Sequence, residues 1–113
     1  MPSRYEALAV DILGAISAIR TFTQDCNAAE YLNSQLISSA CERQLEIVGE
    51  AMTRLRDQHP DRFDQISRGS SIIGLRNRLI HGYDAVDSAI VWDVLVTKLD
   101  AIERDVQRML ETR

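Results

Sequence analysis

Apolar residues recur at steps of three and four along most of this 113-residue chain, and this periodicity restricts it to a fold of amphipathic helices. A first stripe predicts a helix over residues 3–24 and comprises Tyr5, Leu8, Ala9, Ile12, Ile16 and Ile19. A second stripe comprises Ile37, Cys41, Leu45, Val48, Met52 and Leu55. This second helix should end near Gln58, because Pro60 disfavours helical geometry in the residue before it.

Two more helices are expected in the second half of the chain. Ser70 or Ser71 can cap a third helix, and Gly82 stands where a helix commonly stops. A fourth, long helix should begin at Asp87 or Ser88. Its apolar stripe comprises Ile90, Val94, Leu99, Ile102, Val106 and Met109.

Four helices joined by brief connections favour an all-α, antiparallel four-helix bundle, because neighbouring helices must then fold back on each other. Short extra helical turns are expected at residues 28–32 and around residues 63–66. No segment alternates in polarity as a strand would, and there is no linker or repeat, so we expect a single helical domain over residues 1–113. Its 45% hydrophobic content provides one modest core, which a partner surface would help to stabilise.

Gly74 lies inside the third predicted helix, where glycine costs about 1 kcal/mol relative to alanine. Two explanations remain open for its presence. It can allow a close helix crossing in the core of the chain, or it can let two copies of this helix approach each other across a dimer axis.

The charge balance and the cysteines exclude several classes of protein. Seventeen acidic residues against 13 basic ones give a net charge of −4, so any contact with nucleic acid must be local. Cys26 and Cys41 form neither a disulfide framework nor a zinc motif, and we expect Cys41 to be a small buried hydrophobe. Because there is no apolar signal-peptide core or membrane-spanning stretch, we expect a cytoplasmic protein without a membrane partner.

One segment combines residues that carry chemistry: Arg76-Asn77-Arg78-Leu79-Ile80-His81-Gly82-Tyr83. An arginine followed five residues later by histidine is common by chance. The added Asn77 directly after the arginine and Tyr83 two residues after the histidine make the pattern specific.

This segment resembles the Arg-x4-His-x-Tyr signature of the HepT branch of the HEPN superfamily. The resemblance extends to residues 45–51, to Ile73-Gly74-Leu75 and to residues 86–92, and therefore to nearly the whole chain. It implies an all-α bundle that forms a homodimer and cleaves RNA without a metal or cofactor. It also implies a toxin that is encoded beside a nucleotidyltransferase antitoxin of the MntA kind, which adds AMP to the motif tyrosine. By this resemblance Arg76 and His81 are catalytic, Asn77 is supporting, and Tyr83 is the AMPylation site.

The residue types fit metal-independent RNA cleavage on their own chemistry. The imidazole of His81 can move protons at the 2′-hydroxyl or at the leaving oxygen near neutral pH. The guanidinium of Arg76 supplies a fixed pair of donors for the charge that develops on the phosphate, and Arg78 can assist in binding the substrate. Asn77 stands four residues before His81 and could hold its imidazole in one orientation.

Helical geometry limits how these groups can meet. At 100° per residue, Arg76 and His81 point about 140° apart on a regular helix, so one straight helix cannot bring both onto one phosphate. Either the helix is distorted before Gly82, or two copies of the chain share a cleft. The small core favours the shared cleft.

Simpler structural explanations exist for each residue taken singly. His81 can be stabilised by the helix dipole, Tyr83 can lie at the edge of the core, and Arg76 can pair with Glu46 or Glu50. We interpret Glu46 and Glu50 as a solvated or arginine-paired face and not as a metal site. Trp92 is interpreted as a core or dimer-interface residue and not as a base-stacking group, and His59 as a solvated helix end.

The leading hypothesis is therefore an RNA endonuclease that acts as a toxin. The alternative hypothesis is a non-catalytic subunit of a nucleotidyltransferase that binds a nucleotide or a partner in the Arg76/His81 cleft, and the acidity of the chain favours this alternative mildly.

Overall fold

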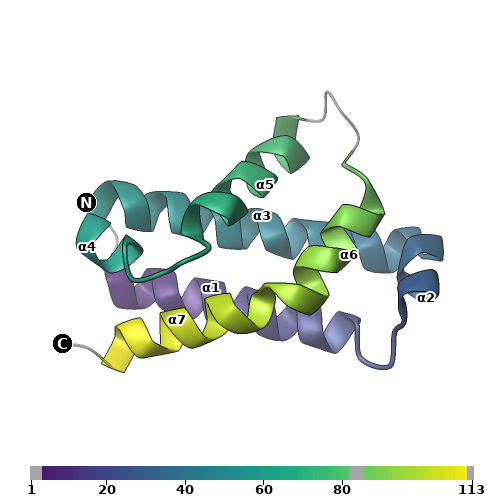
Figure 1. The fold of residues 1–113 in the computed structure, drawn as a ribbon, viewed down its shortest axis with the longest axis horizontal. Coiled ribbons are helices and arrows are strands. Elements are labelled where there is room, and N and C mark those ends of the chain that lie inside the picture. Colours follow the sequence, from purple (N-terminus) through teal and green to yellow (C-terminus); the bar gives the residue numbers. More distant parts are fainter. Residues whose placement is uncertain (1–3, 82–85, 112–113) are drawn as a thin grey trace.

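The computed structural model describes residues 4–81 and 86–111, and every regular element among them is a helix (Figure 1). The predicted all-α bundle is confirmed. The seven helices are α1 (Tyr5–Phe22), α2 (Ala28–Asn33), α3 (Gln35–Gln58), α4 (Pro60–Phe63), α5 (Gly69–His81), α6 (Ser88–Thr97) and α7 (Leu99–Glu111). The two expected extra turns are α2 and α4. None of the helices in the described part of the chain is both long and apolar enough to cross a membrane.

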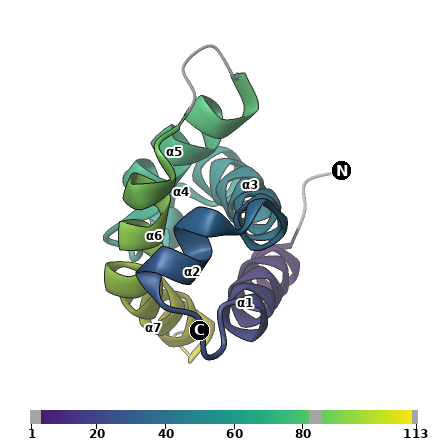
Figure 2. The ribbon, with the colours of Figure 1, turned by 90° about the vertical axis from the view of Figure 1, so that its right-hand side faces the viewer.

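The bundle is organised around α3, its longest helix. α1 and α5 both pack on α3, and α7 packs on α1 (Figures 1 and 2). α2 covers one end of the bundle and contacts both α3 and α6, as the end-on view in Figure 2 shows. α5 lies on the side of α3 away from α1, so the segment that carries the motif stands at the edge of the bundle (Figure 1).

The fourth predicted helix is two helices, so the expectation of one long helix from residue 88 to residue 109 is wrong. α6 ends at Thr97 and α7 begins at Leu99. The Thr97 hydroxyl donates a hydrogen bond of 2.6 Å to the backbone carbonyl of Asp93, and such a bond within a helix bends it. The break lets α6 turn toward α2, while α7 follows α1.

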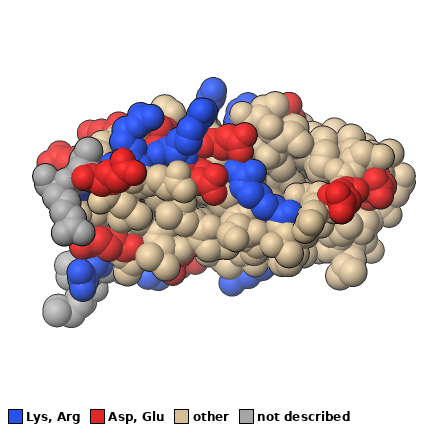
Figure 3. Space-filling model, turned by 90° about the horizontal axis from the view of Figure 1, so that it is seen from below, with Lys and Arg blue, Asp and Glu red and all other residues tan. Residues whose placement is uncertain are grey.

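The interface between α1 and α7 has ion pairs at its edge. Arg20 lies 2.6 Å from Asp100 and 3.1 Å from Glu103, and Asp100 holds the pKa of the Arg20 guanidinium above its usual value. On this side of the molecule, acidic and basic side chains stand next to one another and uncharged residues cover much of the remaining surface (Figure 3). The positive charge of this face is thus largely compensated.

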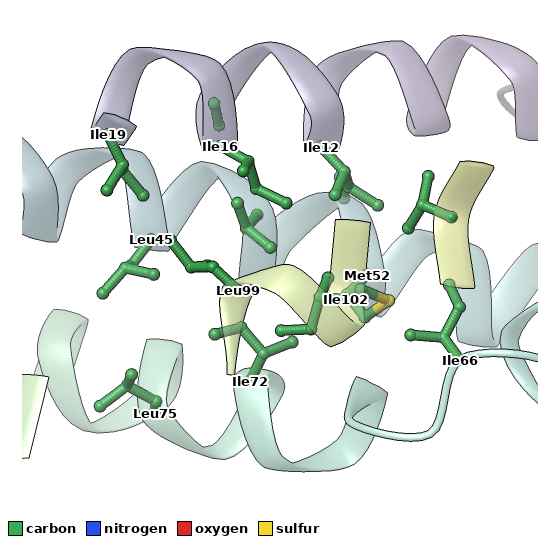
Figure 4. Packing of buried hydrophobic residues seen from close by; sticks show 14 of the residues in the cluster. Ile12, Ile16, Ile19, Leu45, Met52, Ile66, Ile72, Leu75, Leu99 and Ile102 are labelled. Carbon is green, nitrogen blue, oxygen red and sulfur yellow. The ribbon is translucent and has the colours of Figure 1, made fainter. Parts of the chain in front are cut away.

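The core lies between α1, α3, α5 and α7, and isoleucines and leucines fill most of it (Figure 4). Tyr31 of α2 is completely buried against it, and its ring centroid lies 5.1 Å from that of Trp92 on α6. Trp92 is half-buried on the core, as predicted. Cys41 is also completely buried, which confirms its interpretation as a small hydrophobe, and burial raises the pKa of its thiol to about 11.

Candidate RNA-binding site

α5 carries the motif. It begins at Gly69, before the serines Ser70 and Ser71 that were expected to cap it. The amide of Ile72 already donates to the carbonyl of Arg68, so Ser70 and Ser71 lie inside the first turn and do not cap it. Gly69, the first residue of the helix, is buried, and a Cβ atom added there would lie 2.6 Å from Cε1 of Phe63.

The two faces of α5 differ in burial. Ile72, Ile73 and Leu75 are buried, and Arg76 and Asn77 are half-buried. The opposite face, with Gly74 and Arg78, is exposed. Gly74 therefore does not serve a close crossing within the chain, because a Cβ atom added there would meet nothing within 4 Å. The close crossing of α3 and α5 lies instead at Gly49, opposite Arg76.

Arg76 is held differently from the other arginines. Its Nε is buried and has no hydrogen-bond partner among residues 4–81 and 86–111, while its Nη1 donates to Oδ1 of Asn77 over 2.9 Å. The acidic partners considered for it are engaged elsewhere, because Glu46 lies 3.4 Å from Arg43 and Glu50 lies 3.1 Å from Arg54. These pairs confirm that Glu46 and Glu50 form an arginine-paired surface.

Asn77 contacts the arginine of the motif in this structure. We expected it to hold the imidazole of His81, but its side-chain oxygen accepts the hydrogen bond from Arg76. Because an amide oxygen accepts without adding charge, this contact orients the guanidinium and leaves its positive charge uncompensated. The structure therefore places the side-chain oxygen of Asn77 on Arg76.

His81 is the last residue of α5, and its side chain is exposed. All residues from 69 to 81 are α-helical, so the helix is not distorted between Arg76 and His81. The two side chains consequently leave the helix in directions about 140° apart. The sequence left two alternatives open, a helix distorted before Gly82 or a cleft shared by two copies of the chain. The described part of α5 shows no such distortion. Gly82 and Tyr83 lie outside the described residues.

α5 is a local positive region on an acidic protein. The helix contains no Asp or Glu, and within the described residues neither Arg76 nor Arg78 forms an ion pair, nor does Arg68 just before the helix. The arginines that pair with carboxylates lie on other elements: Arg4, Arg20, Arg43, Arg54, Arg56 and Arg108. Uncompensated guanidinium groups along one helix are suited to contact with phosphate.

No side-chain cluster in the described segments could hold a metal ion, since no group of three or more His, Cys, Asp or Glu residues converges there. Both cysteines are free. The second histidine, His59, is not the solvated helix end that we expected. It is half-buried and packs edge-on against the ring of Tyr5, with 6.0 Å between centroids.

Sequence reasoning missed two packing residues, one at the crossing of α3 with α5 and one at the contact of α2 with α6. Gly49 was noted only as part of a longer segment, although an internal glycine in a 24-residue helix is itself a signal of close packing. The completely buried position of Tyr31 had no signal in its own short segment, because it depends on α6 reaching across to α2.

Known proteins resemble this chain along nearly its whole length. The family described as Ribonuclease HepT-like matches residues 12–109. A protein of Methanocaldococcus jannaschii named "Putative RNase" is 30% identical over 102 residues, which cover 90% of this chain and 93% of that protein. A second one from the same organism is 30% identical over 112 residues, covering 98% of this chain and 96% of its own. A "Probable ribonuclease HepT" of Thermococcus cleftensis is 25% identical over 99 residues, covering 88% and 89% of the two chains. No solved structure matches. The chain thus belongs to the HepT-like ribonuclease family of the HEPN superfamily.

Proposed function

We propose that this protein is a metal-independent endoribonuclease, the toxin of a toxin–antitoxin pair in the cytoplasm, with Arg76 and His81 as its catalytic groups. The observation that carries the proposal is the state of Arg76. A half-buried guanidinium is aligned by a neutral amide, keeps a buried Nε without an acceptor, and has no carboxylate partner among the described residues. A phosphate bound at the accessible part of this half-buried guanidinium would supply the missing negative charge.

The proposed reaction is a transesterification within the RNA. The 2′-oxygen forms a bond to phosphorus, the bond from phosphorus to the 5′-oxygen breaks, and the products are a 2′,3′-cyclic phosphate and a 5′-hydroxyl. His81 takes the 2′-hydroxyl proton or delivers one to the 5′-oxygen. Arg76 stabilises the charge on the non-bridging oxygens, and Arg78 binds a neighbouring phosphate.

A homodimer would bring the two catalytic groups to one phosphate. Because α5 is regular up to His81, one copy directs Arg76 and His81 apart, and a two-fold axis near α5 would let one copy supply each. The exposed apolar side chains near this region support such an interface: Ile80 on α5 and Ile90 and Val96 on α6. α6 is apolar on nearly all its faces, although part of it is exposed in the single chain.

The catalytic proposal is tested with purified protein, RNA and excess EDTA. Cleavage should proceed, and both Arg76→Ala and His81→Ala should lower it by at least about a hundredfold with unchanged helical circular dichroism. His59→Ala and Arg104→Ala are the matched controls, because they remove the other histidine and an exposed arginine of α7, and both should cleave normally. A requirement for a metal, or cleavage that survives loss of His81, would overturn the mechanism.

The shared cleft is tested by mixing the two inactive variants. After subunit exchange, Arg76→Ala and His81→Ala chains should regain part of the activity, because a mixed dimer holds one intact set of groups. No recovery after verified exchange would place the site within one copy, and a monomer at micromolar concentration would exclude the dimer.

Regulation is proposed to act at Tyr83, through AMP transfer by a nucleotidyltransferase antitoxin. The other two tyrosines are held in the fold: Tyr31 is completely buried, and the Tyr5 ring lies 4.2 Å under the guanidinium of Arg62. A nucleotide phosphate beside the arginines of α5 would compete with RNA for them.

The partner enzyme and ATP should therefore add one or more AMP units at Tyr83 and stop cleavage. Tyr83→Phe should keep the nuclease activity and escape inhibition, with Tyr5→Phe as the control that is still modified. Modification mapped to Tyr5 or Tyr31 would contradict this proposal.

One observation favours a second candidate function. The net charge of −4 suits a nucleotide- or partner-binding subunit of a nucleotidyltransferase better than it suits a general RNA-binding surface. The same cleavage assay separates the two functions, because such a subunit would bind nucleotide at Arg76 without cutting RNA.

A further inference from the structure

The crossing of α3 and α5 has an exceptionally close approach at one pair of residues. Gly49 is buried in the middle of α3, where a glycine costs about 1 kcal/mol relative to alanine. An added Cβ atom there would overlap the Cβ of Arg76, lie 2.5 Å from its Cγ, and lie 3.4 Å from the carbonyl oxygen of Ile72. The side chain that Gly49 lacks would therefore occupy the place of the Arg76 stem.

This overlap cannot be relieved by a change of rotamer. The Cβ atom of Arg76 is fixed to the backbone of α5, so only a shift of the helix would make room for a side chain at residue 49. A contact with the far end of a long side chain would be much easier to accommodate. α5 can therefore lie this close to α3 only because residue 49 has no side chain.

The close approach also sets the state of the Arg76 guanidinium. With its stem lying directly on the backbone of α3, the side chain buries Nε, while Nη1 reaches Asn77. A longitudinal or outward shift of α5 would expose Nε to water and change the direction of the guanidinium. Packing and the Asn77 hydrogen bond together hold the group in one geometry, as a preorganised donor requires.

We propose that Gly49 is a positioning residue for Arg76: its missing side chain seats the arginine stem on α3 and thereby fixes the guanidinium that binds the scissile phosphate. The proposal rests on the catalytic role of Arg76 proposed above. Gly49 touches no substrate and acts only through Arg76.

The chain offers two matched glycine controls. A Cβ atom at Gly69 would lie 2.6 Å from Cε1 of Phe63, so Gly69→Ala also creates a steric conflict at the start of α5, but one away from Arg76. Gly14 lies exposed on α1, and a Cβ atom added there would meet nothing within 4 Å among the described residues, so Gly14→Ala reports on a glycine substitution in a helix without a conflict.

Gly49→Ala should lower kcat for RNA cleavage by at least about tenfold with a small change in KM, because a shift near 1 Å at a catalytic group is enough for such a loss. Gly69→Ala should reduce thermal stability without this change in kcat, and Gly14→Ala should leave kcat unchanged. A kcat of Gly49→Ala within twofold of the wild type would overturn the proposal.

A second measurement needs no cleavage. In the wild-type protein, NMR should show contacts between the Gly49 α-protons and the Arg76 β-protons, and the Arg76 Nε proton should exchange with water at least about tenfold more slowly than that of exposed Arg78. Gly49→Ala should abolish this protection. Equal exchange at the two arginines, or absence of the contact, would overturn the positioning role even if the variant does not fold.

The two measurements separate this inference from the proposed function. If wild-type protein does not cut RNA, or Arg76→Ala cuts normally, the catalytic proposal fails, whereas the NMR measurement still decides whether Gly49 positions Arg76.

Discussion

Two regions of this molecule each bury a polar side-chain atom without a hydrogen-bond partner, and they do so in opposite settings. At the contact of α2 with α6, the hydroxyl of Tyr31 lies inside the core beside Trp92. At the crossing of α3 with α5, the Nε of Arg76 lies against the backbone of α3. The Tyr31 side chain is completely enclosed, whereas that of Arg76 is only half-buried.

Tyr31 and Arg76 differ in charge and in burial, and these two properties separate a side chain that only fills the core from one that can bind a ligand. Burial raises the pKa of the Tyr31 phenol, so the group stays neutral, and its ring fills a large volume of the core. Arg76 carries a positive charge, and its guanidinium is held by a neutral acceptor. A half-buried guanidinium that keeps its charge and has no carboxylate partner among the described residues has a ligand as its natural partner; an enclosed hydroxyl does not.

The largest effect should come from the acceptor that aligns Arg76. Asn77→Ala removes the hydrogen bond to Nη1, so the guanidinium loses its fixed direction, and cleavage should fall by about ten- to a hundredfold. Asn33→Ala, at the end of α2, is the control and should cut normally. If Asn77→Ala cleaves RNA at the wild-type rate, the hydrogen bond from Arg76 to Asn77 is not needed for cleavage. The difference between Arg76 and Tyr31 would then have no consequence for function.

Tyr31→Phe should have the opposite outcome. It removes the enclosed hydroxyl while the ring keeps its contact with Trp92, so the free energy of unfolding should rise by about 1 kcal/mol. The midpoint of thermal unfolding should rise by about 4 °C, measured by calorimetry, with unchanged RNA cleavage. A loss of stability would show that the hydroxyl has a partner, such as a buried water molecule. The Tyr31 hydroxyl would then stabilise the fold through a hydrogen bond.

The sequence was informative where structure is local. The stripes of α1 and α3 predicted those helices to within a few residues, because the periodicity of an amphipathic helix is a property of the segment itself. The N-cap of α6 was predicted for the same reason: Asp87 accepts from the amide of Ala89. The motif could be found because the spacing of its residues in the chain defines it, and the roles given to these residues stay predictions.

What the sequence could not provide depends on contacts between distant segments. The break between Thr97 and Leu99 follows from α6 and α7 packing on different helices, which a continuous apolar stripe does not reveal. Likewise, nothing in the motif shows that Gly49 lies against Arg76, or that Asn77 turns toward the arginine. Helix periodicity finds the elements, but the state of the Arg76 side chain is decided by the helix that packs across it.

Gly74→Ala tests the outer face of α5, opposite the crossing that holds Arg76. Because nothing lies within 4 Å of an added Cβ atom, the substitution should raise the free energy of unfolding of the monomer by about 1 kcal/mol. If instead two copies approach each other at Gly74, the added methyl group would weaken the dimer. Sedimentation at several concentrations together with thermal unfolding separates the two outcomes.

The smallest effect should come from Glu50→Gln, which tests whether the charge of Arg76 is truly available. Glu50 lies one residue along α3 from Gly49 and pairs with Arg54 over 3.1 Å, with about half of each side chain exposed. Exposed pairs of this kind contribute little, so the free energy of unfolding should fall by no more than about 0.5 kcal/mol. RNA cleavage should not change at low salt, where any effect of a lost carboxylate would be greatest. A clear rise in cleavage by Glu50→Gln would mean that Glu50 competes with the substrate for Arg76. The charge of the guanidinium would then be compensated by Glu50 in solution, and Arg76, like Tyr31, would need no ligand.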